Sequence, residues 1–458
     1  MRRAMVSSMV ALAVAATLSA CGDGAAEPGE GQAGRKEIEV LYKVEPTWPY
    51  LEKSLRAAKA QYEAAHKDVT IKLTPVQGNS EVYYTKLALL NRSAESAPDV
   101  YYHDTFQVNA DVAAGKLAPL DDYLSKWPDW TSQFPDSVKQ AAKAGDGKIY
   151  GVPISTDTRG LWYHKDVFAK AGLPVPWEPE TWADVLTAAR TIKQKVPDAI
   201  PFSMYSTKVH GEAATMQGFE MLLYGAPGGT LYDEAQKKWV TAGKAFTDSL
   251  AFINTIYREE LGPRQADAQN PKLAGLATDE WFPAGKLGIS LDGAWTSASW
   301  KETDPTPWPQ WTEKIGWTPM PTQNGQEPGA VSMSGGWVMA MSSYAPNKQE
   351  AFDFITVATN KENSMAYSVG TGDLAVRKDV AADPKYSAGN PAVKFWTDLA
   401  SVTHYRPAFE EYPKVSAEVQ EAMEAMTSGS RTPEEAAKRY AEALPGVVGG
   451  ADKIVTAP

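Results

Sequence analysis

Short apolar, strand-like segments alternate with amphipathic, helix-like segments along most of this chain. Glu37–Val44 and Val69–Pro75 predict strands, and the stretch between them, Tyr50–Ala65, has the apolar period of a helix. Strand–helix–strand units of this kind form sheets with helices on both faces. The pattern therefore predicts an α/β fold.

The alternation continues beyond these first elements. Further predicted elements are a helix at Val82–Leu90 and strands at Asp99–Tyr102, Ile149–Ile154, Leu161–Tyr163, Leu287–Leu291 and Trp337–Met341. Thr181 and Thr432 are placed to cap helices, the first with Asp184 near the capping-box position and the second with Pro433 as the first helical residue. Three segments rich in turn-forming or polar residues, 225–246, 262–278 and 301–313, predict loops.

The length of the chain requires more than one hydrophobic core. Residues 37–458 number more than four hundred, whereas single cores stop growing at about 250–300 residues. Hydrophobic residues make up 43% of the sequence, which is enough to build such cores. At least two domains are expected.

The first residues have the features of a targeting segment. Arg2 and Arg3 precede a short apolar run from Val6 to Leu18, which is too short to cross a bilayer. Leu18–Cys21 resembles the lipobox of bacterial lipoproteins, which implies cleavage before Cys21 and attachment of acyl chains to its sulfur. We predict a signal peptide at 1–20, a polar tether at 21–36 and a lipid anchor on the extracytoplasmic face of the cell membrane. An ordinary secretory signal with an incidental cysteine is the alternative.

Charge and cysteine content exclude several classes of function. The net charge is −11 and basic residues do not cluster, so the chain lacks the cationic surface that nucleic acid requires. Cys21 is the only cysteine. Once it carries lipid, the mature chain has no disulfide, thiolate nucleophile or cysteine metal ligand.

Common catalytic motifs are also absent from the sequence. The five histidines show no metal-ligand spacing, and there is no serine-hydrolase motif or phosphate-binding glycine loop ending in Lys-Ser or Lys-Thr. We therefore expect a protein that is not an enzyme and needs no metal or other cofactor. A secreted glycosidase remains an alternative, because that chemistry needs only two carboxylates beside a sugar bond.

Aromatic residues are numerous, with 15 tryptophans and 20 tyrosines. Core packing explains most of them. The remainder could line a cleft, where a flat ring covers the C–H face of a sugar while polar groups bind its hydroxyls.

Five groups of residues, in the same order, carry a family resemblance. They are Pro98–Asp104 with Ala114–Leu124, Tyr150–Pro153 with Asp157–Asp166, Phe282–Lys286 with Asp292–Trp295, Ser334–Trp337, and Thr432–Ala436. Together they resemble the family 1 extracellular solute-binding proteins, the sugar-capturing subunits of carbohydrate ABC importers. One departure is Ala375–Lys378, where many relatives carry a proline and a small polar residue before the arginine.

The resemblance implies a two-lobed α/β fold of the type II periplasmic-binding-protein kind, with a hinge between lobes. One lobe would contain 37–153 and 320–359, and the other 157–317 and 361–445. The implied function is capture of a neutral di- or oligosaccharide between the lobes and delivery to a membrane permease, which works with a cytoplasmic ATPase. A monomer is expected. A binder of a charged solute, such as a polyamine or a glycerophosphodiester, is the closest alternative.

The strongest candidates for ligand contact are two carboxylates and two indoles. Asp104 ends a predicted strand, where its carboxylate could accept hydrogen bonds from sugar hydroxyls; its alternative role is to cap a helix near Phe106. Asp157 matches a sugar-contacting position of the family, and its alternative role is a turn carboxylate. Trp295 and Trp337 follow small residues that would let a ring lean over a cleft, with core packing as the alternative.

Four further residues are weaker candidates for ligand contact. Gly335 could offer backbone close to the ligand. Arg377 could bind a hydroxyl pair or pair with an acid. Glu45 and Asn79 follow the first two predicted strands, where relatives often place polar contacts.

Overall fold

Two separate β-sheets organise the protein. The chain is seen in a computed structural model that describes residues 36–44, 49–301, 306–388 and 390–457. Cys21 and Glu45 lie outside these residues. The first sheet has the order β2-β1-β3-β13-β4 and the second the order β10-β5-β9-β6. These strands are β1 (Lys36–Val44), β2 (Val69–Gln77), β3 (Val100–Asp104), β4 (Gly151–Ser155), β5 (Arg159–His164), β6 (Ile200–Ser203), β9 (Leu287–Gly293), β10 (Ile315–Thr318) and β13 (Trp337–Met341).

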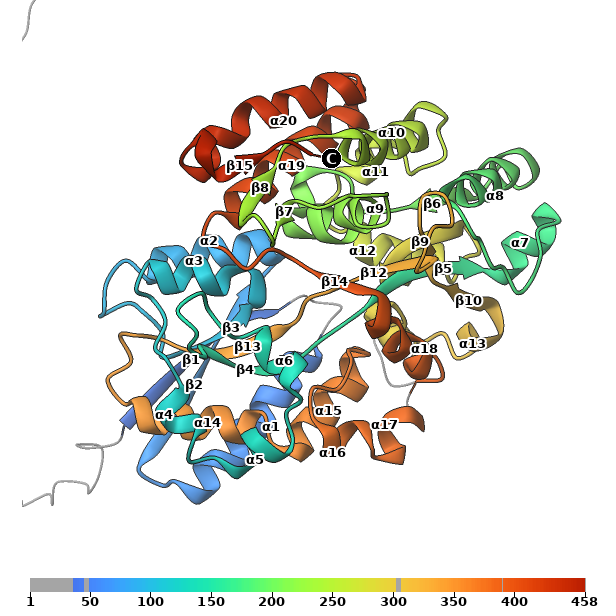
Figure 1. Ribbon diagram of the computed structural model, residues 1–458. Helices are drawn as coiled ribbons and strands as arrows, with labels where there is room; N and C mark the ends of the chain where they lie inside the picture. The colour runs from blue at the N-terminus through green and yellow to red at the C-terminus, as the bar shows by residue number, and fades with distance from the viewer. Residues whose placement is uncertain (1–35, 45–48, 302–305, 389, 458) are drawn as a thin grey trace, which may run out of the picture. The chain divides into compact units, whose positions relative to one another are not determined.

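The first sheet is buried on both faces. On one face, the β1 residues Ile38 and Val40 pack with Leu55 of α1 (Tyr50–Ala65) and Phe352 of α14 (Lys348–Ala358). On the other face, Leu41 packs with residues of α2 (Ser80–Leu90) and α3 (Val108–Ala113). The alternation follows from the two-residue period of strand side chains. Figure 1 shows α2 and α3 on one side of this sheet and α1 and α14 on the other.

The second sheet is covered by helices and by a cluster of indoles. One face packs against α7 (Lys165–Ala171) and α8 (Trp182–Lys195), and the same core extends to α10 (Lys244–Arg258), α19 (Tyr412–Ser428) and α20 (Pro433–Val448), which pack against one another. The other face presents Trp162, which contacts the rings of Trp300, Trp311, Trp317 and Trp396 at centroid distances of 4.9–6.3 Å. Many of the tryptophans counted in the sequence therefore pack in this core.

The remaining elements are shorter. Two three-stranded sheets contain β11 (Met320–Pro321), β12 (Ala330–Ser334) and β14 (Thr403–Tyr405), and β15 (Ile454–Val455), β8 (Lys238–Val240) and β7 (Tyr232–Asp233). The other helices are α4 (Asp121–Leu124), α5 (Pro128–Ser132), α6 (Asp136–Gln140), α9 (Met221–Leu223), α11 (Gln265–Ala268), α12 (Leu273–Gly275), α13 (Trp311–Lys314), α15 (Lys361–Thr371), α16 (Lys378–Ala381), α17 (Pro384–Ala388) and α18 (Val393–Asp398).

Two neighbouring links join the first sheet to the rest of the protein, one of them to the second sheet and the other to the three-stranded sheet of β12. Residues 156–158 join β4 of the first sheet to β5 of the second, and residues 335–336 join β12 to β13 of the first sheet. Thr156 also forms an isolated β-bridge with Leu374. α15 packs against α1 of the first sheet, so a division of the chain at residue 361 would separate these two helices.

Most elements predicted from the sequence are confirmed. α1 and β13 have the predicted bounds, and Thr181 and Thr432 both form capping boxes. The loop prediction for 262–278 is wrong, because the segment forms α11 and α12 and enters a π-helical stretch at Leu276–Trp281. The loop predicted at 225–246 contains β7 and β8, which pair as an antiparallel hairpin.

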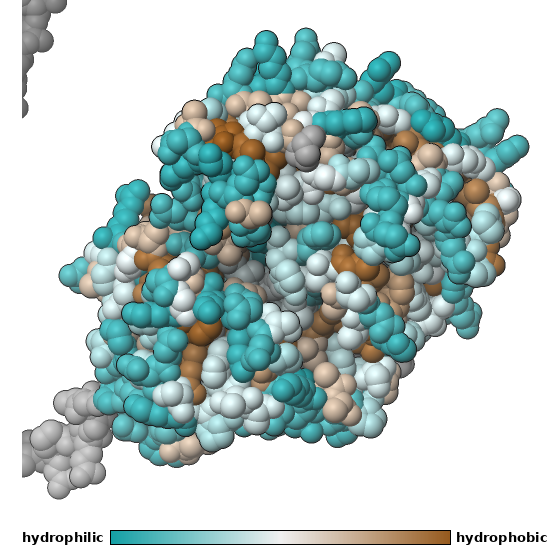
Figure 2. Space-filling model, viewed as in Figure 1, coloured by the Kyte–Doolittle hydropathy of each residue, from teal (hydrophilic) through white to brown (hydrophobic). Residues whose placement is uncertain are grey.

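Hydrophilic residues dominate the face of the protein drawn in Figure 2, with hydrophobic residues in small scattered groups. Across the residues that the structure describes, none of the helices combines the length and the apolar character needed to cross a bilayer.

Candidate functional site

A cavity of about 260 Å³, here called the central pocket, lies between the two main sheets at the links that join them. The first sheet and its helices contribute Lys43, Asn79, Tyr102, Asp104 and Trp337 to its wall. The second sheet and its neighbours contribute Arg159, Tyr205, Glu212, Met216, Asp292 and Trp295, while Asp157, Gly336, Asp373 and Arg406 lie at or near the links. The pocket therefore combines aromatic rings with many ionisable side chains.

Asp104 ends β3 and forms an ion pair with Arg406, which lies 302 residues further along the sequence. Its Oδ1 accepts a hydrogen bond from Nη2 of Arg406 at 2.7 Å and another from the backbone N–H of Phe106 at 3.3 Å. The predicted alternative role, a helix cap, is therefore present together with a place in the pocket wall. Oδ2 accepts no hydrogen bond from the described residues, so this oxygen is available to a ligand.

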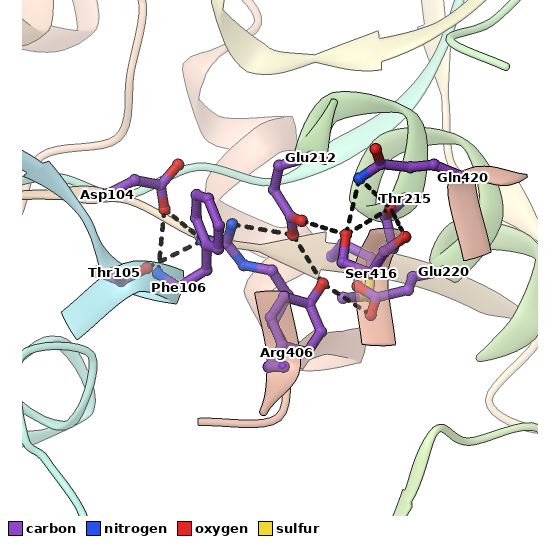
Figure 3. Close-up of polar contacts among 12 residues, drawn as sticks. Asp104, Thr105, Phe106, Glu212, Thr215, Glu220, Arg406, Ser416 and Gln420 are labelled. Carbon is purple, nitrogen blue, oxygen red and sulfur yellow. Dashed lines mark hydrogen bonds and ion pairs between the residues drawn. The ribbon is translucent and has the colours of Figure 1, made fainter. Parts of the chain in front are cut away.

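Arg406 links Asp104 of the first sheet to Glu212, which lies on the side of the second sheet (Figure 3). Its Nη2 also donates to Thr105 at 3.0 Å, and its Nη1 donates to Oε1 of Glu212 at 3.3 Å. The guanidinium lies over the ring of Phe106, 5.0 Å from the centroid. Gly335 permits this arrangement, because a Cβ at that position would lie 3.0 Å from Nη2 of Arg406.

Behind Arg406, two buried glutamates share the hydroxyl of Tyr412. The hydroxyl lies 2.7 Å from Oε1 of Glu212 and 3.1 Å from Oε1 of Glu220. A hydroxyl has one proton to donate, so both contacts are satisfied when Glu220 is protonated and donates to the hydroxyl oxygen. Burial, together with the charge of Glu212, raises the pKa of Glu220 and favours this protonated state.

A second carboxylate–guanidinium pair, Asp157 with Arg159, lies at the link between β4 and β5. Oδ1 of Asp157 accepts hydrogen bonds from Nη1 of Arg159 and, at 2.9 Å, from the backbone N–H of Gly335. Nη1 also donates to the carbonyl of Met333 at 2.9 Å. The guanidinium lies 4.9 Å from the ring centroid of Trp295.

This pair is only half used by the protein. Nε of Arg159 is enclosed without a hydrogen-bond partner, and Nη2 donates to none of the described residues. Oδ2 of Asp157 likewise accepts no hydrogen bond within the described part of the chain. A buried donor left without a partner costs about 1–3 kcal/mol. The pair thus presents unused hydrogen-bonding groups in the wall of the pocket.

Two more buried carboxylates, Asp292 and Asp373, line the pocket and form no ion pair with any residue that the structure describes. Burial raises the pKa of Asp292 to about 6, and burial with the charge of Asp157 raises the pKa of Asp373 to about 8. A protonated carboxyl both donates and accepts hydrogen bonds, which suits it to a hydroxyl group.

Trp337 is the indole in the part of the pocket nearest the first sheet. Tyr102 stacks on it with centroids 4.3 Å apart and an angle of 4° between the rings. Nζ of Lys43 lies over the same indole, 5.1 Å from the centroid. Trp337 is partly buried and packs against the core of the first sheet, so the two roles considered from the sequence, packing and pocket lining, coexist.

The structure brings five of the predicted ligand-binding residues into the lining of one pocket. Asn79, Asp104, Asp157, Trp295 and Trp337 all line the central pocket. Asn79 also caps α2, because its side chain accepts a hydrogen bond from the N–H of Val82 at 3.2 Å.

Two other predicted residues lie elsewhere. Arg377 does not line the central pocket: its guanidinium is 2% exposed and donates to Asp379, Asp129 and the carbonyl of Thr359. The alternative role, pairing with acids, accounts for it. Gly335 lines a smaller cavity of about 180 Å³ that also contains Asp157 and Trp337, and its backbone positions Asp157 instead of lining the central pocket.

Several wall residues were not singled out from the sequence. Arg159 follows Asp157 by two residues, and this spacing places both side chains on one side of an extended chain, so a signal for it existed. Glu212 and Arg406 are 194 residues apart, and no local pattern connects them. Asp292 and Asp373 each lie beside a glycine, a context shared by many ordinary loop residues.

Known proteins resemble this chain over most of its length. The family described as bacterial extracellular solute-binding protein matches residues 48–365. The galactooligosaccharide-binding protein of Bacillus subtilis is 22% identical, covering 96% of this chain and 96% of the relative. The maltooligosaccharide ABC transporter solute-binding lipoprotein of Streptococcus pneumoniae is 26% identical, covering 75% of this chain and 74% of the relative.

Solved structures show the same fold. An ABC transporter solute-binding protein from Thermotoga lettingae, bound to α-D-tagatose, has a TM-score of 0.77 at 22% identity, covering 90% of this chain and all of that one. The predicted two-lobed α/β fold is therefore confirmed. From the match over residues 48–365 and this agreement in fold, the chain belongs to the family of bacterial extracellular solute-binding proteins.

Proposed function

We propose that this chain is the extracytoplasmic binding subunit of an ABC importer and captures a neutral di- or oligosaccharide in the central pocket. The observation that carries the proposal is the pocket wall, where Trp337, the half-used pair of Asp157 and Arg159, and the available Oδ2 of Asp104 face one cavity between the sheets. Rings of this kind cover the apolar face of a sugar, and charged partners form strong hydrogen bonds with its hydroxyls. The oligosaccharide ligands named for two relatives support the same class of ligand.

In this proposal the bound sugar leaves unaltered. The two lobes close around it at the links near Asp157 and Gly335, and the loaded monomer then binds a membrane permease that works with a cytoplasmic ATPase. A ligand can shift the lobes between open and closed arrangements only through its different affinity for the two. Because the sugar is not altered, incubation of the protein with oligosaccharides should release no new reducing ends.

A thermal-shift screen tests the ligand class. The purified chain is heated alone and with maltose, melibiose, cellobiose, mannobiose and their trisaccharide homologues. A sugar at one hundred times its dissociation constant should add about 2.7 kcal/mol to the free energy of unfolding. The proposal is wrong if no uncharged saccharide raises the melting temperature.

A charged solute is the second candidate, because carboxylates outnumber cations in the wall. The acidic lining residues are Asp104, Asp157, Glu212, Asp279, Asp292 and Asp373, against the basic residues Lys43, Arg159 and Arg406. Spermidine and glycerophosphocholine in the same screen test this alternative. Binding of spermidine should weaken strongly as salt increases, whereas binding of a neutral sugar should hardly change.

We also propose that Cys21 carries the lipid that holds the protein to the membrane. The sequence around Cys21 supports this, and one relative is named as a lipoprotein. Changing Cys21→Ser should move the protein from the membrane fraction to the soluble fraction without changing its affinity for sugar. Continued membrane association of the variant would contradict the anchor.

A further inference from the structure

The unused atoms of Asp157 and Arg159 lie next to one another in the wall of the central pocket. Their shared contact uses Oδ1 of the carboxylate and Nη1 of the guanidinium. This leaves Oδ2 as an acceptor and Nη2 as a donor, neither of which has a hydrogen bond within the described residues. Both side chains are buried, with 5% and 4% of the residue exposed.

The backbone around Arg159 is fixed by β12. The hydroxyl of Ser332 accepts a hydrogen bond from the N–H of Arg159 at 2.9 Å and donates to its carbonyl at 3.0 Å. The carbonyl of Met333 then holds Nη1. These contacts orient the guanidinium before any ligand arrives.

We propose that Asp157 and Arg159 form a clamp that binds two neighbouring hydroxyl groups of the sugar, and that Trp295 supports the arginine instead of stacking on the sugar. The inference rests on the proposed function and assigns the recognition step within it. One hydroxyl donates to Oδ2 of Asp157, and the next accepts from Nη2 of Arg159. The ligand class is a saccharide with an unsubstituted pair of adjacent hydroxyls at the position that meets the clamp.

The role of Trp295 follows from the position of the guanidinium. Arg159 lies over its ring at 4.9 Å, so one face of the indole is covered by the protein itself. A cation over an indole is attracted by the electrons of the ring, and the attraction increases when water is excluded. Trp295 is thus a positioning residue that acts through Arg159.

Isothermal titration tests the clamp with the disaccharide from the thermal-shift screen, among maltose, melibiose, cellobiose and mannobiose, that gives the largest shift. Arg159→Met should weaken binding on the order of 10- to 100-fold, as expected for loss of hydrogen bonds from a charged donor. Arg159→Lys keeps the charge but loses the planar fork, and should recover only part of this loss. Arg190→Met is the matched control, because Arg190 pairs with Glu259 at the surface.

A double variant distinguishes support of Arg159 by Trp295 from direct contact between Trp295 and the sugar. Trp295→Leu should weaken binding about tenfold and Trp295→Phe should restore most of it, because phenylalanine also attracts a cation. If Trp295 acts through Arg159, the double variant Arg159→Met with Trp295→Leu binds no more weakly than Arg159→Met alone. Losses that multiply would show that the indole contacts the sugar itself and would overturn this part of the proposal.

Analogues of the sugar test the clamp on the natural chain, which avoids any loss of folding in the variants. Monodeoxy forms of the chosen disaccharide are titrated in turn. At least two adjacent positions should lose on the order of tenfold in affinity when their hydroxyl is removed. The clamp is wrong if no deoxy form is weakened. If the natural chain binds no saccharide at all, the proposed function fails, a result distinct from failure of the clamp alone.

Discussion

Two buried arginines, Arg377 and Arg159, show how differently the same side chain is used in this protein. At Arg377, the Nε, Nη1 and Nη2 atoms all donate to Asp379, Asp129 or Thr359. At Arg159 in the central pocket, two of the three nitrogens have no partner among the described residues. Burial and ion pairing are common to both. What differs is whether donors remain for a ligand, and this separates a structural arginine from a candidate binding residue.

Arg406 lines the pocket, but its Nη1 and Nη2 both donate within the protein, so it sharpens the comparison as a pocket arginine with a structural role and has the largest expected effect. Arg406→Met should lower the free energy of unfolding by about 3–5 kcal/mol, because it leaves Glu212 buried without its cation. Urea denaturation measures the change, and Arg406→Lys should restore part of it. A loss below about 1 kcal/mol would mean that Glu212 is already neutral in the native protein.

Arg377 tests the structural role in this comparison. Arg377→Met should cost about 2–3 kcal/mol of stability, less than a fully buried pair, because Asp129 is 41% exposed and regains water. Its affinity for sugar, titrated at a temperature where the variant is folded, should equal that of the natural chain. A weakened affinity at Arg377→Met would remove the distinction between Arg377 and Arg159.

The unpaired carboxylates of the pocket make stability depend on pH. The pKa of Asp373 is raised to about 8, from an ordinary value of 3.8, so the native state keeps a proton that the unfolded state releases between these values. The free energy of unfolding should therefore fall as pH rises from about 4 to 8, by at most about 1.4 kcal/mol per pH unit for this group.

The pKa values of Asp292 and Glu220 are also raised, so these groups change stability with pH in the same direction as Asp373. Comparison of Asp373→Asn with the natural chain therefore isolates the contribution of Asp373. The variant should lose stability less steeply over this pH range in urea denaturation. Identical slopes would show that Asp373 is ionised in the native protein at neutral pH. Asp383→Asn is a control, because Asp383 is a surface carboxylate whose pKa is lowered by local hydrogen bonds.

Two asparagines that cap helices give the smallest expected effect on stability, and they differ in whether they line the pocket. Asn79 and Asn360 each accept a hydrogen bond from the third residue of the helix that follows, at 3.2 and 2.9 Å. Alanine at either position should cost about 1 kcal/mol of stability. Only Asn79→Ala should also change sugar affinity, since only Asn79 lines the central pocket. Equal affinities in both variants would limit Asn79 to its capping role.

Local chemistry explains what could be predicted from the sequence. Apolar periodicity defined α1 and β13, and capping residues defined the starts of α8 and α20, because these features depend on neighbours in the chain. Asp104 was found because it ends a strand at the pocket, whereas Asp157 was found through its position in a family motif. The α-helices within 262–278 were missed, since their turn-rich composition resembles that of a loop.

The partners of the pocket residues could not be predicted in the same way. Arg406 and Asp104 are 302 residues apart, and the pair forms only when both main sheets are assembled. Arg377 was considered for the pocket because of its position in a family motif, but Asp129, 248 residues away, determines its role. The identity of the residues shows which chemistry is available, whereas the folded chain decides which donors are already used.

The hydroxyl of Ser332 holds the backbone of Arg159 from both sides, and this has a consequence for stereochemistry. The side chain is held as well, because Nη1 of Arg159 donates to Asp157 and to the carbonyl of Met333, so little rotational freedom remains to be lost when a sugar arrives. A guanidinium fixed in this way cannot follow a hydroxyl that changes from equatorial to axial. Epimers that differ at a single carbon of the diol should therefore be rejected.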